Sequence, residues 1–269
     1  MNTNKTLSLA IMSGKGGVGK TNIVLNLGYA LQQADNTAVL MDCDLGLANL
    51  DVLLGISPEL NLRDLLQSDV DAADVLVPIE SGFDMLPATS GVPELVEMDE
   101  DVQDILFKKL LTIAGRYDYL MLDLGAGISP TVLSLAALAQ LRVVVITPEP
   151  TSLTDSYAMI KVLTTHYGIK DFLVVVNQAL SAQEARQTFD RLAAACKNFL
   201  HIELQNLGFV HQDTTLVESV RRQTPLMKYA PNAPASKDIF SLARKIMRYR
   251  KGNSERIAER PILKKFQSE

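Results

Sequence analysis

The stretch SGKGGVGKT, residues 13–21, decides the fold because of the segments on either side of it. The apolar run before it, residues 7–12, predicts a buried strand, and a helix is predicted to begin near Asn22. Glycines allow successive backbone amides to turn toward one anion, and the amino terminus of the helix adds its dipole. The stretch matches G-x-x-x-x-G-K-[ST] and predicts a phosphate-binding loop for a nucleotide.

In such a loop a lysine reaches the outer phosphates and a hydroxyl ligates Mg²⁺, which assigns these roles to Lys20 and Thr21. The alternative is a glycine-rich turn without a ligand, which the order of strand, loop and helix disfavours. The predicted nucleotide-binding residues of this stretch are Gly14, Lys15, Gly16, Gly17, Val18, Gly19, Lys20, Thr21 and Asn22. A nucleotide and Mg²⁺ are therefore the expected ligands of the loop.

Short apolar runs alternate with helix-length amphipathic segments along the rest of the chain. Nearly continuous hydrophobicity is typical of parallel strands that helices cover on both faces. The further strands expected are residues 38–41, 119–122, 143–147 and 172–176, with 207–210 as a weaker candidate. An edge strand near residues 83–86 is expected within the insert 56–105, and a closing helix over residues 236–250. These elements predict an α/β fold with a doubly wound, mainly parallel sheet.

Composition limits the classes of protein that the chain can belong to. The chain has 269 residues and is 47% apolar, enough to bury a sizeable core. Its longest apolar runs are too short to cross a bilayer, and its amino end has no secretory-signal pattern. Two cysteines, Cys43 and Cys196, support neither a disulfide framework nor a thiolate metal site. A cytoplasmic protein is expected.

Charge is unevenly distributed along the chain. The net charge is −5, but residues 241–269 carry nine Lys or Arg against three Glu, so the rest sums to −11. An acidic body makes nucleic acid an unexpected partner. The compact domain is expected to span residues 1–251, with residues 252–269 as a basic tail.

The tail contains a candidate for a membrane contact. Pro261 suits the first turn of a short amphipathic helix that would place Ile262, Leu263 and Phe266 on one face. Such a helix would bind an anionic membrane surface weakly and reversibly. The alternative is a disordered, solvated basic tail.

Three aspartates follow predicted strands, at the sheet edge where open α/β folds bind ligands. Asp42 and Asp44 lie in MDCDLG after the second strand, and Asp123 ends YLMLD. Phosphoryl transfer needs mainly positioning and charge stabilisation, so a carboxylate that orients water is a sufficient local catalyst. A solvated turn is the alternative for the first pair, but the following Asn49 and Asp51 favour function.

The motif KGGVGKT is the deviant phosphate loop of the MinD/ParA group of ATPases, which the chain resembles over nearly its whole length. The resemblance implies a MinD-like P-loop NTPase fold of the SIMIBI class and a slow ATPase that is active as an ATP-bound homodimer. It implies that Lys15 reaches the ATP of the partner subunit, like an arginine finger supplied in trans. A solvated lysine on a mobile loop is the alternative.

The resemblance also implies roles for the polar residues at the other strand ends. Asp42 would support the Mg²⁺ shell, Asp44 would hold the attacking water, and Lys15, Lys20 and Asp44 together would be catalytic. Asp123 matches the Walker B aspartate, although Leu124 stands where many relatives have Thr or Ser.

Two later positions match the adenine side of the site in that group. Asn177 ends the run FLVVVN, where relatives read the adenine edge. Asp213 matches a turn that borders the base, with His211 in place of the usual proline.

The segment TPEPTSLTDSYAMIK, residues 147–161, resembles the flagellar-number regulators called FlhG or FleN, as do LGAGIS and VRRQTPL. Glu149 and Asp155 match positions that face the extra lysine in relatives, across the dimer and within the apo monomer respectively. Ordinary helix capping is the alternative for this segment.

This second resemblance implies a regulator of flagellar number or placement, with a MinD-like division-site role as the alternative. Its partners would be an FlhF-type GTPase, a flagellar transcription regulator or a component of the flagellar switch complex. The D-Q-A-x-x-L-R helix with which many members activate that GTPase is absent from the sequence, and six residues precede the first strand. A separate protein is therefore expected to supply that stimulation.

Other uses of this fold fit the sequence less well. DNA partitioning of the ParA type conflicts with the acidic body. Iron–sulfur carriers need paired cysteines between subunits, and a ligase or synthetase needs a substrate site that the sequence does not reveal.

Overall fold

The computed structural model describes residues 4–264 apart from residues 45–49, 67–69, 72 and 88–99. The strands are β1 (Leu7–Ser13), β2 (Ala38–Cys43), β3 (Val77–Glu80), β4 (Phe83–Leu86), β5 (Tyr119–Ala126), β6 (Leu141–Ile146), β7 (Phe172–Ala179) and β8 (Gln205–His211). The helices are α1 (Lys20–Gln32), α2 (Leu50–Leu54), the 3₁₀-helix η1 (Leu62–Leu66), α4 (Glu100–Ala114), α5 (Pro130–Leu138), α6 (Pro150–Tyr167), α7 (Ala182–Leu200), α8 (Thr214–Arg221), α9 (Leu226–Tyr229), α10 (Pro234–Gly252) and α11 (Ser254–Ala258).

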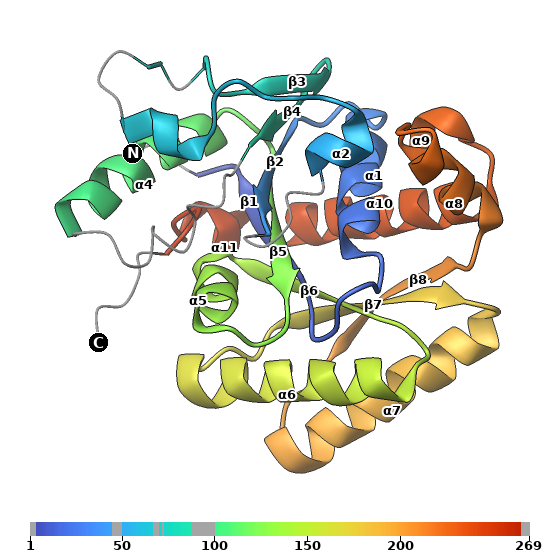
Figure 1. Ribbon diagram of the computed structural model, residues 1–269. Helices are drawn as coiled ribbons and strands as arrows, with labels where there is room; N and C mark the ends of the chain where they lie inside the picture. The colour runs from blue at the N-terminus through green and yellow to red at the C-terminus, as the bar shows by residue number, and fades with distance from the viewer. Residues whose placement is uncertain (1–3, 45–49, 67–69, 72, 88–99, 265–269) are drawn as a thin grey trace.

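The strands form one sheet in the order β3-β4-β2-β5-β1-β6-β7-β8 (Figure 1). Neighbouring strands are parallel except β3, which runs antiparallel to β4. The chain therefore winds outward from β1 in both directions, which confirms the predicted doubly wound α/β fold. The register places Asp42 directly beside Asp123 at the carboxyl ends of β2 and β5.

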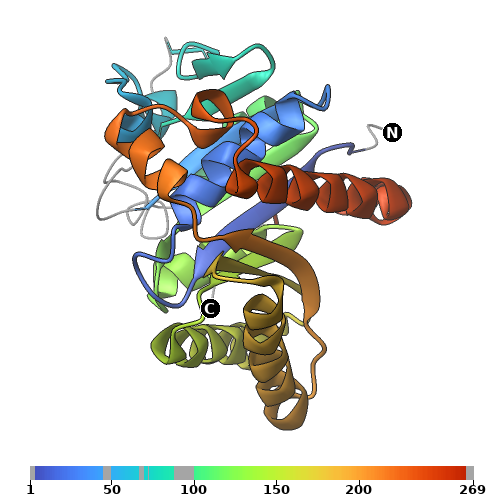
Figure 2. The same cartoon turned by 90° about the vertical axis from the view of Figure 1, so that its right-hand side faces the viewer.

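Helices cover both faces of the sheet, and each face has its own apolar core. Residues of α4, α5, α6 and α7 belong to the core on one face, and residues of α1, α9 and α10 belong to the core on the other (Figures 1 and 2). Within β2, Val39 and Met41 contribute to the first core, and Ala38 and Leu40 to the second. Burial on both faces explains why the strands read as continuous apolar runs.

Most predicted elements are present, with differences at the edges. The six predicted core strands are observed, and α1 begins at Lys20, two residues before the predicted start. The strand at residues 83–86 is present but is not the sheet edge, because β3 pairs with its outer side. Sequence reasoning missed β3 because it has only four residues, one of them a proline, and its side chains are only partly buried or exposed.

The compact structure does not end at residue 251, which corrects the predicted domain boundary. Helix α11 follows α10 directly, and its Ile257 is buried. Farther along, Leu263 is only 2% exposed and packs in the same core as α4 and α5. The segment after residue 251 is therefore part of the folded body as far as it is described.

Residues 261–264 are not helical, so the amphipathic helix predicted from Pro261 is absent from the described residues, and Phe266 lies outside them. The Gln140 side chain donates to the Pro261 carbonyl at 2.9 Å, and Lys264 N–H donates to the Leu138 carbonyl at 2.9 Å. Because residues of the folded body provide hydrogen-bond partners for these backbone groups, the segment does not need the hydrogen bonds of a helix. No helix within the described residues is long and apolar enough to cross a membrane.

Candidate functional site

The loop between β1 and α1 needs glycine at two positions for different reasons. A Cβ on Gly14 would lie 2.2 Å from the backbone carbonyl carbon of Asp155, so only glycine lets the loop lie against α6. Gly19 has φ of +85°, and a Cβ there would lie 2.4 Å from Nδ2 of Asn177. Gly19 is also the amino-terminal cap residue of α1, so the loop leads directly into the helix amino terminus.

The side chain of Asn177 is hydrogen-bonded to this loop. Its side chain is 1% exposed, and Nδ2 donates to the Val18 carbonyl at 2.7 Å. The other amide atom, Oδ1, has no hydrogen-bond partner among the described residues. The residue lies inside β7 rather than at its end, so the geometry gives it a loop-holding role that the sequence did not predict.

Lys20 and Asp123 form a buried ion pair at the centre of the site. Lys20 Nζ lies 2.7 Å from Asp123 Oδ1, and the two side chains are 7% and 1% exposed. Asp123 Oδ2 has no partner among the described residues. Burial raises the pKa of Asp123, while the charge of Lys20 and hydrogen bonds from Lys20 and Thr21 act in the opposite direction.

Asp42 lies beside this pair and carries a perturbed carboxyl group. Burial raises the pKa of Asp42 to about 6, and the nearby charges of Asp123 and Asp44 add to the effect. Backbone N–H groups partly compensate, with Asp44 N–H donating to Asp42 Oδ1 at 3.0 Å. Carboxylates crowded in this way favour a cation or a proton between them.

Asp44 lies close to the end of β5. A Cβ on Gly125 would be 3.4 Å from Asp44 Oδ1, an ordinary contact distance, so the Asp44 carboxylate lies beside Gly125 of β5. The segment that follows, residues 45–49 with Asn49, lies outside the described residues. Asp51 is in the first turn of α2. The structure thus brings Asp42, Asp44 and Asp123 to one edge, next to Lys20.

Lys15 points away from that centre toward the start of α6. Its ammonium group forms an ion pair with Glu149 and donates to Thr151 Oγ1 at 3.1 Å. The expected partner within one subunit was Asp155, and this is corrected to Glu149. The reason is that Asp155 lies a turn later in α6, where its backbone packs under Gly14. Thr151 was missed, although it stands two residues after Glu149 in the segment already singled out.

Asp213 caps two helices with one carboxylate. Its Oδ1 accepts from Thr215 N–H at 2.8 Å, and its Oδ2 accepts from Ala235 N–H at 3.2 Å. Burial alone would raise the pKa of Asp213, but these hydrogen bonds lower it overall. His211, in the proline position, has Nδ1 at 2.7 Å from Asp238 of α10. Both residues thus join the end of β8 to the helices that follow it.

Comparison with known proteins places this geometry in a family. The profile described as "ParA: NUBPL iron-transfer P-loop NTPase" matches residues 4–247. The chain is 37% identical over 238 residues to the antiactivator FleN of Pseudomonas aeruginosa. The aligned region covers 88% of this chain and 85% of FleN. It is 33% identical over 245 residues to the flagellum site-determining protein YlxH of Helicobacter pylori, covering 90% and 82% of the two chains.

Solved structures agree with this placement. The MinC:MinD cell division protein complex of Aquifex aeolicus aligns with a TM-score of 0.69 at 27% identity, covering 90% of this chain and 96% of that one. MinD of Pyrococcus horikoshii with Mg-ADP aligns with a TM-score of 0.70 at 23% identity, over 90% and 96% of the chains, and shares the fold. The sequence match over residues 4–247, the strand–loop–helix around Lys20 and the aspartates beside it lead to one conclusion. The chain belongs to the ParA family of P-loop NTPases.

Proposed function

We propose that this protein is an ATP-dependent, dimerising switch ATPase that regulates the number or placement of flagella. The observation that carries the proposal is the second lysine of the loop. Lys20 already occupies the inner position, paired with Asp123, whereas Lys15 lies on the outer rim with 38% of its side chain exposed. A cation in that position is free to act on a nucleotide other than its own.

The residues of the site fit ATP and Mg²⁺. The loop amides, Lys20 and Thr21 would hold the phosphates, and Thr21, Asp42 and Asp123 would hold Mg²⁺ directly or through water. The buried Asp123 Oδ2, which has no partner in the described part of the chain, supports a ligand at this point. When bound, Mg²⁺ would neutralise charge that develops on the phosphates. Mg²⁺ usually keeps several waters and is bound through one or two carboxylates together with substrate phosphates.

Hydrolysis would require Asp44 to orient a water molecule and Lys15 to reach across the dimer. In the single subunit Lys15 is held by Glu149, and both side chains are exposed. Exposed ion pairs contribute about 0–1 kcal/mol, so Lys15 can exchange Glu149 for a partner's phosphate at little cost. Glu149 and Asp155, at the start of α6, would then face the other subunit. Asn177 and Asp213 would border the base.

Two variants test this mechanism together. Lys15→Ala should still bind ATP through Lys20 and the loop amides but should neither dimerise nor hydrolyse. Asp44→Ala should dimerise with ATP and hydrolyse it on the order of 100-fold more slowly, because the water loses its orienting carboxylate. Light scattering after size exclusion and phosphate release are the measurements. Lys161→Ala, which removes an exposed lysine later in α6, is the matched control and should behave like the parent.

An ATP-dependent dimer of Lys15→Ala with parental turnover would contradict the action in trans. Parental turnover of Asp44→Ala would show that another residue positions the water.

The flagellar role rests on the similarity to FleN and YlxH, whose names describe an antiactivator and a flagellum site-determining protein. The partners proposed are an FlhF-type GTPase, a flagellar transcription regulator or a switch-complex component. Deleting the gene should change the number or position of flagella per cell and leave division septa normal. The Lys15→Ala gene should fail to restore the parental pattern. Misplaced septa with normal flagella would instead favour the MinD-like alternative.

Reversible association with an anionic membrane is proposed only for a state in which the tail leaves its docked position. Leu263 is buried in the structure, so it offers no apolar surface to lipid while it stays there. Flotation on phosphatidylglycerol vesicles should then depend on ATP. Equal flotation with ATP and ADP, or none with either, would contradict a nucleotide-dependent release.

A further inference from the structure

A second concave site lies at the end of the sheet opposite the phosphate-binding loop. It has a volume of about 850 Å³ and lies where β1 and β5 begin, against the second half of α10 and the start of α11. Cavities of this size are typical of small-molecule sites. Its apolar wall includes Tyr119, Met247 and Ile257. We refer to it as the basal cavity.

The basal cavity carries a strong excess of positive charge. Its cationic lining residues are Lys5, Arg244, Arg248, Arg250 and Lys251, and its single acidic one is Glu255. Among the described residues only Arg250 of these cations has a carboxylate partner. The other four therefore concentrate charge of one sign in one hollow, which focuses the electrostatic field there.

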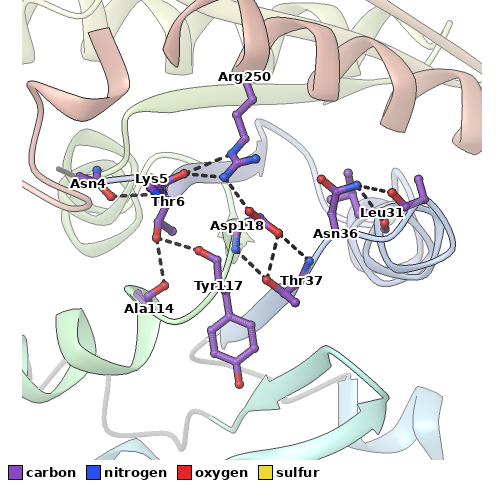
Figure 3. Close-up of polar contacts among 11 residues, drawn as sticks. Asn4, Lys5, Thr6, Leu31, Asn36, Thr37, Ala114, Tyr117, Asp118 and Arg250 are labelled. Carbon is purple, nitrogen blue, oxygen red and sulfur yellow. Dashed lines mark hydrogen bonds and ion pairs between the residues drawn. The ribbon is translucent and has the colours of Figure 1, made fainter. Parts of the chain in front are cut away.

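Arg250 is used to build the wall of the cavity (Figure 3). Its Nη2 donates to Asp118 Oδ1 at 2.6 Å and to the Lys5 carbonyl at 2.8 Å. The other Asp118 oxygen accepts from the N–H and hydroxyl of Thr37, at 3.0 and 3.1 Å. These bonds tie the end of α10 to the segments that enter β1, β2 and β5. The cations around Arg250 are thus displayed on a frame that needs no ligand to form.

We propose that the basal cavity is a second ligand site and that it binds a small phosphate-bearing anion. Guanidinium and ammonium groups are the side chains best suited to phosphate oxygens, and the lining includes Arg248 and Lys251 from α10 and Lys5 from the segment before β1. The apolar wall at Tyr119 and Met247 would contact the rest of the ligand. The concave shape favours a small anion over a flat or rod-shaped polyanion. The phosphate belongs to a free metabolite or to a lipid headgroup.

The test compares two double variants with the same change in charge. Arg248→Gln with Lys251→Gln neutralises the basal cavity, and Lys161→Gln with Lys237→Gln neutralises exposed lysines outside it. Inorganic triphosphate is titrated calorimetrically into protein whose phosphate loop is saturated with Mg-ADP, at constant free Mg²⁺. The parent should show one additional site. Affinity should fall at least tenfold in the first double variant and less than twofold in the second, with unchanged thermal unfolding in both.

A second arm separates the sources of phosphate. Phosphatidylglycerol vesicles that bind through Arg248 and Lys251 and are displaced by triphosphate would support the site and identify the source as a lipid headgroup. Triphosphate binding without vesicle binding would support it with a free anion as ligand. The absence of both, or equal weakening in the two double variants, would overturn the proposal. Binding of duplex DNA through these residues without triphosphate binding would also overturn it, in favour of a nucleic-acid surface.

Discussion

The two ends of the sheet treat charge in opposite ways. At the carboxyl end each loop lysine has a carboxylate partner, Glu149 for Lys15 and Asp123 for Lys20. At the amino end Lys5, Arg248 and Lys251 have no carboxylate partner in the described part of the chain. A lysine that is paired with a carboxylate can exchange it for a nucleotide phosphate, because the carboxylate and the phosphate are both negatively charged. Charges left unbalanced within the chain are available to an ion from outside.

The largest effect should come from breaking the buried pair at the carboxyl end. Lys20→Ala leaves Asp123 buried without its cation, which should lower the free energy of unfolding by about 3–5 kcal/mol. Nucleotide affinity should fall on the order of 100-fold. Lys15→Ala, in the same loop, is the matched control, and because its pair is exposed it should cost about 0–1 kcal/mol. Urea unfolding and binding of a fluorescent ADP check both, and equal costs would contradict the difference in burial.

The next effect concerns the tail segment that is docked on the body through Leu263. Leu263→Ala should destabilise the fold by about 2–4 kcal/mol, because it leaves a cavity among Leu135, Leu138 and their neighbours. Leu180→Ala removes a leucine that is 71% exposed and should change stability by no more than about 0.5 kcal/mol. Urea denaturation compares the two. A Leu263→Ala cost as small as that of Leu180→Ala would mean that the tail is not docked in solution.

A smaller effect, of opposite sign, is expected at Asp42. The pKa of about 6 in the folded state lies above the ordinary value of 3.8, so the folded protein binds this proton more tightly than the unfolded chain does. The ionised carboxylate therefore costs stability above pH 6, and the cost disappears as the pH falls toward 4. Asp42→Asn should stabilise the nucleotide-free protein by about 1–3 kcal/mol at pH 8, with a smaller gain at pH 4. The same variant should bind Mg-nucleotide more weakly.

Urea unfolding at pH 4, 6 and 8 measures this dependence, with Asp51→Asn as the control on a neighbouring, more exposed carboxylate. A gain that stays constant with pH would show that Asp42 titrates normally.

The smallest effect should come from the frame of the basal cavity. Arg250→Met keeps the aliphatic part of the side chain but removes the bonds to Asp118 and the Lys5 carbonyl. Because the Arg250 and Asp118 side chains are 23% and 34% exposed, water compensates in part and the expected loss is about 1 kcal/mol. Lys237→Met, on the same helix, should stay within about 0.5 kcal/mol. Thermal unfolding distinguishes the two, and a loss above about 3 kcal/mol would mean that the bonds are shielded from solvent.

Much of the carboxyl end could be predicted from the sequence because its chemistry is local. A strand, a glycine-rich loop and a helix that are consecutive in the chain place Lys20 and Thr21 by short-range geometry alone. Asp42 and Asp123 could be placed because each lies at the end of an apolar run, and parallel strands bring such ends to one edge. The doubly wound fold followed from the same alternation of runs.

Contacts between distant segments could not be predicted in this way. The partner of Lys15 depends on how closely α6 approaches Gly14, and the bond from Asn177 to Val18 joins residues 159 positions apart. The sequence around Leu263 is compatible both with a docked tail and with a free amphipathic helix. Only the shape of the core decides which of the two forms.

The amino acid sequence by itself determined the nucleotide chemistry, since the phosphate loop and the aspartates are motifs whose function needs only a few neighbouring residues. The tertiary structure alone decided the basal cavity, whose lining comes from segments as far apart as Lys5, Asn36, Tyr119 and Arg248. The physical reason is that a motif encodes backbone geometry over one turn or strand end. A cavity instead depends on where whole helices come to rest, and that is set by burial of apolar surface over the entire domain.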